Sequence, residues 1–188
     1  MRAADFSALL VLLLALAALP ALGADARPPE PDGYRLGDYR SPTPATVNGR
    51  PSLDTAAAHR IWAAHAAIFI DVLPAPHRPD GLPQGAIWAP RPRLDVPGSI
   101  WLPDVGRGSI SPELAAWFRA QLERITAGDR AASLVFYCLA DCWMSWNATK
   151  RALSWGYGGA QWYEEGTDGW EVAGFPLAAT PPPSDMPR

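Results

Sequence analysis

The chain has 188 residues and a formal net charge of −3 at pH 7. This acidic balance excludes the basic surface of a nucleic-acid-binding protein and the polybasic run of a protein that binds anionic lipid. The length fits one domain whose core folds without staples, so the two cysteines are not needed as a scaffold.

The first 23 residues have the pattern of a secretory signal peptide. Arg2 precedes an unbroken Leu/Ala/Val run over residues 8–18, and small residues follow just before Ala24. The apolar run is short and Pro20 ends it, which disfavours a membrane span; an uncleaved anchor is the alternative. We therefore expect a periplasmic protein that is not stably inserted in the membrane after signal cleavage.

Three segments follow the signal peptide. Residues 24–33 are a proline-rich polar lead that we expect to be mobile. Residues 34–177 form the domain. Residues 178–188 form a proline-rich tail that we expect to be disordered.

Strand and helix patterns alternate through the domain. This alternation predicts a single α/β domain in which helices flank a mainly parallel central sheet. Between the first two strands lies a long Pro/Gly/Arg loop, residues 74–97, and loops of that length are usually functional or linkers. The expected helices are 53–66, 111–127 and 145–155, with a turn or short helix at 166–170, and the expected strands are 67–73, 99–102, 134–137 and 160–163.

Two of the expected helices carry clear start signals. Asp54 or Ser52 can cap the first helix, and Ser111 caps the second with proline at its first position. Trp117 lies on the inner stripe of the second helix and is expected in the core. His65 lies on the inner face of the first helix and is expected to be a core histidine rather than a ligand.

The stretch 134–170 holds both cysteines and five of the nine tryptophans. An apolar strand delivers Cys138 into a short loop, and a helical pattern begins near Ser145. A thiol at the carboxyl end of a strand, facing the amino terminus of a helix, is in an environment that favours the thiolate. We therefore expect the functional site here.

Three motifs resemble a known family. They are YCLADCWMSWNA at 137–148, PGSIWLP at 97–103 and GTDGW at 166–170. Their order resembles a rhodanese-like domain, with Cys138 where that pattern has its catalytic cysteine. More closely, they resemble the periplasmic PQQ-dependent catabolism-associated CXXCW motif proteins (PQQ, pyrroloquinoline quinone), although the literal spacing here is CxxxCW.

The resemblance implies a rhodanese-like fold and an accessory role in PQQ-dependent alcohol oxidation. The implied partners are a PQQ-dependent dehydrogenase or its periplasmic electron-transfer or transport partners. The cysteine loop departs from a sulfurtransferase loop, which usually carries glycine and arginine after its cysteine. Asp141, if it points inward, would also repel thiosulfate and raise the thiolate pKa. Thiol redox chemistry is therefore favoured over ordinary sulfur transfer.

The two cysteines are close enough in sequence for a disulfide if the loop is turn-like. In an oxidising compartment a disulfide is the default for such a pair, and a short-loop disulfide is of the reducible kind. We predict that Cys138 attacks and Cys142 resolves. The alternatives are a structural disulfide that shapes the loop, and a Cu(I) site at the pair to which only His77 could be recruited.

Other side chains near the cysteines have two interpretations each. Trp143 and Trp146 could form an aromatic wall that contacts PQQ, or could plug the loop in the core. Asp71 could orient the active loop or cap a backbone N–H, and Asp168 is expected to form a turn. No cofactor beyond this PQQ contact is expected. The alternative function is a non-catalytic binding module for a redox cofactor or a partner dehydrogenase.

Overall fold

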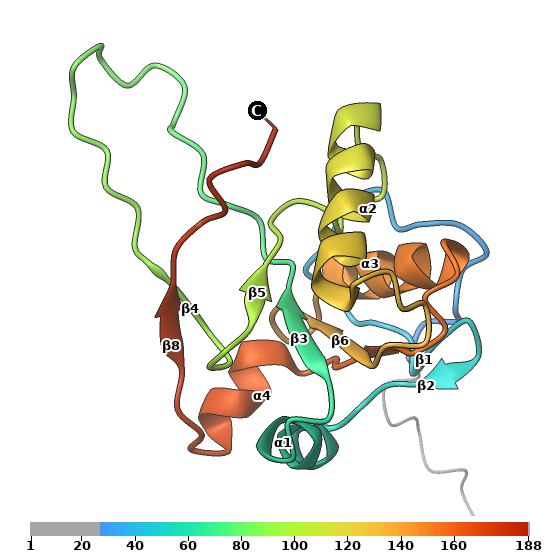
Figure 1. Cartoon of the computed structure of the whole chain (residues 1–188). Helices are drawn as coiled ribbons and strands as arrows, with labels where there is room; N and C mark the ends of the chain where they lie inside the picture. The colour runs from blue at the N-terminus through green and yellow to red at the C-terminus, as the bar shows by residue number, and fades with distance from the viewer. Residues whose placement is uncertain (1–26, 188) are drawn as a thin grey trace, which may run out of the picture.

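A four-stranded parallel sheet forms the centre of the molecule (Figure 1). The computed structural model describes residues 27–187. The strands lie in the order β5-β3-β6-β7, and every neighbouring pair is parallel. Their bounds are Ile68–Asp71 (β3), Ile100–Trp101 (β5), Leu134–Tyr137 (β6) and Ala160–Trp162 (β7). The predicted α/β fold with a parallel sheet is confirmed.

Helices cover both faces of this sheet (Figure 1). Side chains alternate along the strands, so Ile70 and Phe136 enter one apolar cluster while Phe69 and Val135 enter another. The first cluster lies under α2 and α3, and the second lies under α1 and α4. The helices are Thr55–Ala63 (α1), Pro112–Thr126 (α2), Trp143–Ser154 (α3) and Gly166–Val172 (α4).

The predicted caps of the first two helices are correct, but one predicted core residue is not. The Asp54 carboxylate accepts the N–H of Ala57 at 2.6 Å, and Ser111 Oγ accepts the N–H of Leu114 at 3.1 Å. Helix α1 ends at Ala63, so His65 is not on a helix face. It has φ 50° and is exposed, and the expected core histidine is therefore wrong.

Two short antiparallel pairs lie outside the central sheet. Strands β1 (Thr46–Val47) and β2 (Arg50–Pro51) form one, and β4 (Arg93–Asp95) and β8 (Ala178–Thr180) form the other. The tail from residue 178 was expected to be disordered, but its first three residues pair with β4. In Figure 1 the long loop before β4 extends away from the sheet, and β8 lies beside β4.

The predicted signal peptide, residues 1–23, lies outside the described residues. The described part of the proline-rich lead contacts the β1–β2 turn, where the Glu30 carboxylate accepts Thr46 Oγ1–H at 2.6 Å and the N–H of Gly49 at 3.1 Å. Between residues 27 and 187, no helix has the length and apolar character to span a membrane.

Candidate functional site

A disulfide joins Cys138 and Cys142 at the carboxyl edge of the sheet. Cys138 follows the last residue of β6, a central strand, and its Cα lies 6.4 Å from that of Cys142. Helix α3 begins at Trp143, two residues before the predicted start at Ser145, so Cys142 is the N-cap. Cys138 is 0% exposed and Cys142 is 3% exposed. The two predicted site cysteines are therefore brought together, and both are buried.

Residues 34–47, which we name the cover segment, lie over the cysteine loop. The N–H of Ser41 donates to Asp141 O at 3.1 Å, and the N–H of Trp143 donates to Tyr39 O at 2.9 Å. Arg40 and Cys142 form a single antiparallel bridge. The first amide of α3 is therefore used by the cover segment and does not point at a cysteine sulfur.

The cover segment also buries the two tryptophans beside the cysteines. Trp143 is 2% exposed and its Nε1–H donates to Ser41 Oγ and Pro42 O, both at 3.1 Å. Trp146 is 0% exposed and its Nε1–H donates to Thr46 O at 2.8 Å. Both side chains pack in the core, as the alternative interpretation had it. Their contact with PQQ stays a prediction.

The carbonyl oxygen of Cys138 is held by contacts from two other elements, β4 and α4. It accepts the N–H of Thr167 at 3.1 Å, and Thr167 Oγ1 and Arg93 Nη2 each lie 3.4 Å from it. Gly166 allows this approach, because a Cβ there would lie 2.5 Å from Cys138 O. Gly166 also has φ +53°, a backbone conformation that glycine adopts without strain. The start of α4 thus fixes the strand end that carries the disulfide.

Arg93 and Asp71 form a buried ion pair beneath the loop. Asp71 is 0% exposed, Arg93 Nε donates to its Oδ2, and the N–H of Leu73 donates to Oδ1 at 2.8 Å. Burial raises the pKa of Asp71, and the nearby Arg93 opposes that rise. Asp71 therefore caps a backbone N–H and, through Arg93, also supports the cysteine loop. Arg93 was not identified from the sequence. The signal for it was Asp71, a carboxylate within an apolar strand pattern, which needs a cation nearby when it is buried.

A second buried carboxylate, Asp95, lies at the end of β4. Its Oδ1 accepts Thr180 Oγ1–H at 2.7 Å, which ties β4 to β8. Its Oδ2 is buried and has no hydrogen-bond partner within residues 27–187. Burial raises the pKa of Asp95 to about 6. This group therefore titrates close to neutral pH.

Two acidic residues near the loop differ from their predicted roles. Asp168 lies in the first turn of α4, where its Oδ2 accepts the N–H of Ala140 at 3.1 Å. The expected turn former is thus a further anchor of the cysteine loop. Asp141 is exposed and has φ 50°. The part of the argument against thiosulfate that needed Asp141 to point inward is therefore wrong.

The described residues hold no preformed ligand set for Cu(I), the alternative site at the cysteine pair. The two cysteines are bonded to each other and offer no thiolate in this state. Across the described residues, no group of three or more His, Cys, Asp or Glu side chains is placed to hold a metal ion. His77 lies instead beside Asp104, with Nε2 at 3.7 Å from Oδ2.

Comparisons with known proteins give structural similarities only. No protein-family model and no curated protein matches the chain. A full-length protein from Lactobacillus plantarum is 18% identical with a TM-score of 0.45, covering 69% of this chain and 88% of that one. An uncharacterised protein from Saccharomyces cerevisiae is 22% identical with a TM-score of 0.39, covering 65% and 92%. The human single-domain sulfurtransferase TSTD1 is 21% identical with a TM-score of 0.42, covering 66% and 97%. These similarities define neither a family nor a function for the chain.

Proposed function

We propose that the protein is a rhodanese-like periplasmic accessory factor of PQQ-dependent alcohol oxidation, and that Cys138 and Cys142 are its thiol–disulfide centre. The motifs at 137–148, 97–103 and 166–170 support the family and the oxidation system. The parallel sheet, with Cys138 at the end of a central strand, supports the fold. The observation that carries the redox role is the disulfide that closes this short loop.

A ring this small contributes little to stability. Loop-closure entropy gives about 2 kcal/mol for a ring of about five residues, against about 4.7 kcal/mol for about a hundred. The fold already has two buried clusters that pack on opposite faces of the sheet. A disulfide between residues only four positions apart in the chain is therefore better explained by chemistry than by stabilisation.

The proposed reaction is exchange with a partner protein that carries two thiols. A partner thiolate attacks Cys138 Sγ, the Cys138–Cys142 bond breaks, and Cys142 leaves as a thiolate that takes up a proton. The partner's second thiolate then attacks the mixed disulfide and releases Cys138, which is protonated in turn. The partner loses two electrons and two protons, and the cysteine pair gains both. In the reverse direction Cys138 attacks the partner's disulfide and Cys142 resolves the mixed disulfide, the roles predicted for the pair.

Exchange requires movement of the cover segment. With Cys138 at 0% and Cys142 at 3% exposure, no thiol reaches a sulfur in the closed state. The hydrogen bonds of Ser41 and Tyr39 to the loop backbone must break first. We therefore place the docking of the partner, a PQQ-dependent dehydrogenase or its electron-transfer or transport partner, on the cover segment.

The same burial favours the second candidate function, a binding module with a permanently closed disulfide. In that case the pair only shapes the loop, and both cysteines are dispensable for partner binding. The Cys138→Ser, Cys142→Ser double variant separates the two. Unchanged support of PQQ-dependent alcohol oxidation in a strain carrying only this variant would establish the binding module and refute the thiol–disulfide centre.

Trapping of a mixed disulfide tests the chemistry directly. In Cys142→Ser the single thiol of Cys138 should form a mixed disulfide with glutathione disulfide, detected by mass spectrometry of the intact protein. The matched variant Cys138→Ser should react at least about tenfold more slowly, a difference of about 1.4 kcal/mol in activation free energy. Equal rates in the two variants, or no adduct in either, would contradict the assigned roles.

A further inference from the structure

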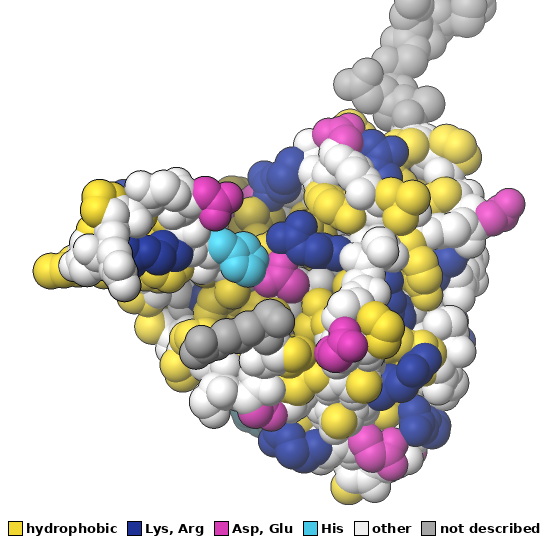
Figure 2. Space-filling view, turned by 90° about the horizontal axis from the view of Figure 1, so that it is seen from above, with side chains coloured by type: hydrophobic (Ala, Val, Ile, Leu, Met, Phe, Trp, Pro, Cys, Tyr) yellow, Lys and Arg dark blue, Asp and Glu magenta, His cyan; other side chains and the backbone are white. Residues whose placement is uncertain are grey.

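A cavity of about 610 Å³ opens near the carboxyl edge of the sheet, apart from the disulfide. Figure 2 looks down on this end of the molecule and shows a hollow bordered by charged and apolar side chains. The cavity lies between the loops that follow β3 and β5, the start of α2 and the tail, and neither cysteine lines it. Its polar end holds His77, Asp104 and Arg107, and its apolar side chains include Ile110, Leu114 and Met186.

Asp104 is the unusual residue of this cavity. Its side chain is only 6% exposed, and its Oδ2 is buried without a hydrogen-bond partner among residues 27–187. Its backbone has φ 64°, a left-handed conformation that aspartate adopts more readily than most residues. A buried carboxylate oxygen without a hydrogen-bond partner calls for an explanation, and a ligand group at this position supplies one.

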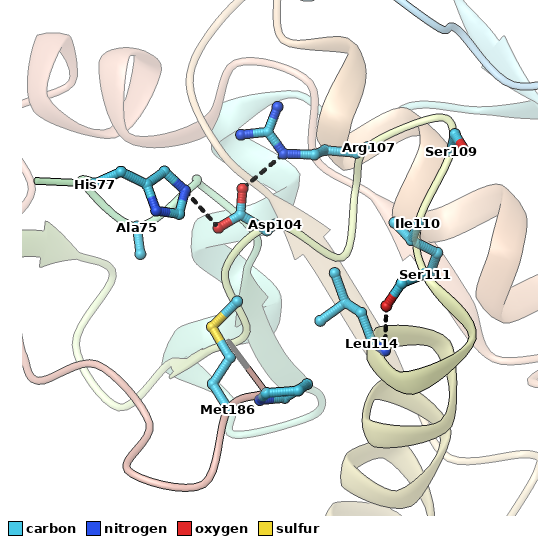
Figure 3. Close-up of a pocket in the computed structure, with 10 residues that line it drawn as sticks. Ala75, His77, Asp104, Arg107, Ser109, Ile110, Ser111, Leu114 and Met186 are labelled. Atoms are coloured by element: carbon cyan, nitrogen blue, oxygen red, sulfur yellow. Dashed lines mark hydrogen bonds and ion pairs between the residues drawn. The ribbon is translucent and has the colours of Figure 1, made fainter. Parts of the chain in front are cut away.

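Arg107 and His77 complete the polar end. Arg107 Nε donates to Asp104 Oδ1 at 2.8 Å, the one side-chain hydrogen bond that Arg107 makes within the described residues. His77 Nε2 lies 3.7 Å from the other oxygen, Oδ2. Figure 3 shows both side chains pointing toward Asp104. The hydrogen bond between Arg107 and Asp104 uses only Nε and Oδ1. Asp104 Oδ2 can therefore accept a hydrogen bond from a ligand, and the terminal N–H groups of Arg107 can donate to it.

The loop that carries Asp104 and Arg107 is rigidly held. Arg151, a buried residue of α3, donates to Val105 O at 2.6 Å, to Arg107 O at 2.9 Å and to Gly108 O at 3.0 Å. Gly106 lies so close to α3 that a Cβ there would be 2.2 Å from Met144 O. The backbone that carries Asp104 and Arg107 is therefore held in place before any ligand arrives, which reduces the entropy lost on binding.

We propose that this cavity binds a free α-amino acid with an apolar side chain. The ammonium group donates to Asp104 Oδ2, the carboxylate accepts from the terminal nitrogens of Arg107, and the side chain packs on the apolar wall. Ammonium and carboxylate are adjacent in such a ligand, as Asp104 and Arg107 are in the site. A simple anion would meet Asp104, and a simple cation would meet Arg107, so a dipolar ligand fits the pair better than either.

The apolar wall gives the side-chain preference. Leu114 comes from the first turn of α2, Ile110 from the residues just before it, and Met186 from the tail. In Figure 3 Leu114 and Met186 lie below Asp104 and its two partners. Burial of an aliphatic side chain here removes apolar surface from water on both partners. This site is independent of the thiol–disulfide function proposed above.

Calorimetric titration of the purified protein with L-leucine, L-methionine and L-phenylalanine tests the proposal. At least one of the three should bind with a Kd below about 1 mM. N-acetyl-L-leucine lacks the ammonium group and L-leucinamide lacks the carboxylate, and each should bind at least about tenfold more weakly than L-leucine. Absence of binding by all three amino acids, or binding of either blocked compound as tightly as L-leucine, would overturn the proposal.

Variants locate the binding site. Asp104→Asn keeps the shape of the side chain and should weaken binding at least about tenfold, whereas Asp80→Asn, an exposed carboxylate of the neighbouring loop, should leave it unchanged. Arg107→Gln, at a side chain that is 41% exposed, gives a second test if the Asp104 variant does not fold. Binding that survives both folded variants would refute the site. Binding that persists in Cys138→Ser, Cys142→Ser shows that it does not depend on the disulfide.

Discussion

Arg93 Nη2 lies 3.4 Å from the carbonyl oxygen of Cys138, so the first residue of β4 contacts the strand end that carries the disulfide. The same guanidinium pairs with Asp71 at the end of the neighbouring strand. Two central strands, β3 and β6, are thus linked at their carboxyl ends by one side chain. The position of the cysteine loop depends on this link.

Loss of Arg93 should destabilise the fold strongly. Arg93→Leu leaves the carboxylate of Asp71, 0% exposed, without its cation, and breaking a buried pair in this way costs about 3–5 kcal/mol. The measurement is the free energy of unfolding in urea at pH 7. Arg91→Leu, an exposed arginine two residues away, is the control and should change it by less than about 0.5 kcal/mol. Equal effects of the two substitutions would show that the Asp71–Arg93 pair does not support the fold.

Gly166→Ala should also destabilise the fold, through the approach of α4 to Cys138. The added Cβ would lie 2.5 Å from Cys138 O, at a residue with φ +53°. Gly174→Ala is the matched control, because it has φ +76° but no atom within 4 Å of its Cβ position. Both variants place alanine in a left-handed conformation, which costs about 1–2 kcal/mol. A larger loss of unfolding free energy in Gly166→Ala than in Gly174→Ala, measured in urea, is therefore due to the contact with Cys138 O. Equal losses would mean that the α4 contact is dispensable.

Stability should fall as pH rises through the titration of Asp95. Burial raises the pKa of this carboxyl from 3.8 to about 6, so the folded state binds more protons than the unfolded state between these values. The contribution of Asp95 to the free energy of unfolding is fully present below about pH 4 and is lost as pH rises through about 6. Its magnitude is at most about 3 kcal/mol.

The Asp95→Asn variant, which cannot titrate, isolates this effect. The difference in unfolding free energy, variant minus wild type, should increase between pH 4 and pH 7 and then stay constant. Urea unfolding at several pH values measures it, with Asp80→Asn, at an exposed carboxylate, as the control. If the Asp95→Asn and wild-type curves run parallel over this range, Asp95 does not titrate as described.

Weakening the cover segment should speed reduction of the disulfide. The hydroxyl of Tyr39 donates to Leu36 O and accepts the N–H of Gly108, both at 3.0 Å. Tyr39→Phe removes both hydrogen bonds and should raise the rate of reduction by a small dithiol about tenfold, the effect of about 1.4 kcal/mol on the opening equilibrium. For Tyr34→Phe, whose hydroxyl makes no hydrogen bond within residues 27–187, the rate should be unchanged. A rate unaffected by Tyr39→Phe would mean that the cover segment does not control access.

The elements that sequence predicted best are those with local signals. Asp54 and Ser111 are side-chain caps, and they marked the starts of α1 and α2 correctly. The start of α3 was placed two residues late because its N-cap, Cys142, makes no side-chain cap hydrogen bond. His65 was placed in the core because the apolar pattern of α1 gave no sign that the helix ends at Ala63.

The parts of the site that sequence did not reveal depend on contacts between distant residues. Trp143 and Trp146 are buried by a segment about one hundred residues earlier in the chain, and no local pattern encodes that cover. Strand β8 forms only because β4 lies beside it. The cysteine pair itself was predicted, since four residues of separation already bring two thiols within reach of each other.

The reduction potential of the Cys138–Cys142 pair tests the central claim most directly. It is measured by equilibrating the purified wild-type protein with dithiol–disulfide buffers of known potential and counting free thiols by mass after alkylation in denaturant. An exchange-competent pair should have a potential above about −300 mV, within reach of other thiol–disulfide proteins. A potential well below about −300 mV would mark a permanent structural bond and contradict the proposed thiol–disulfide function.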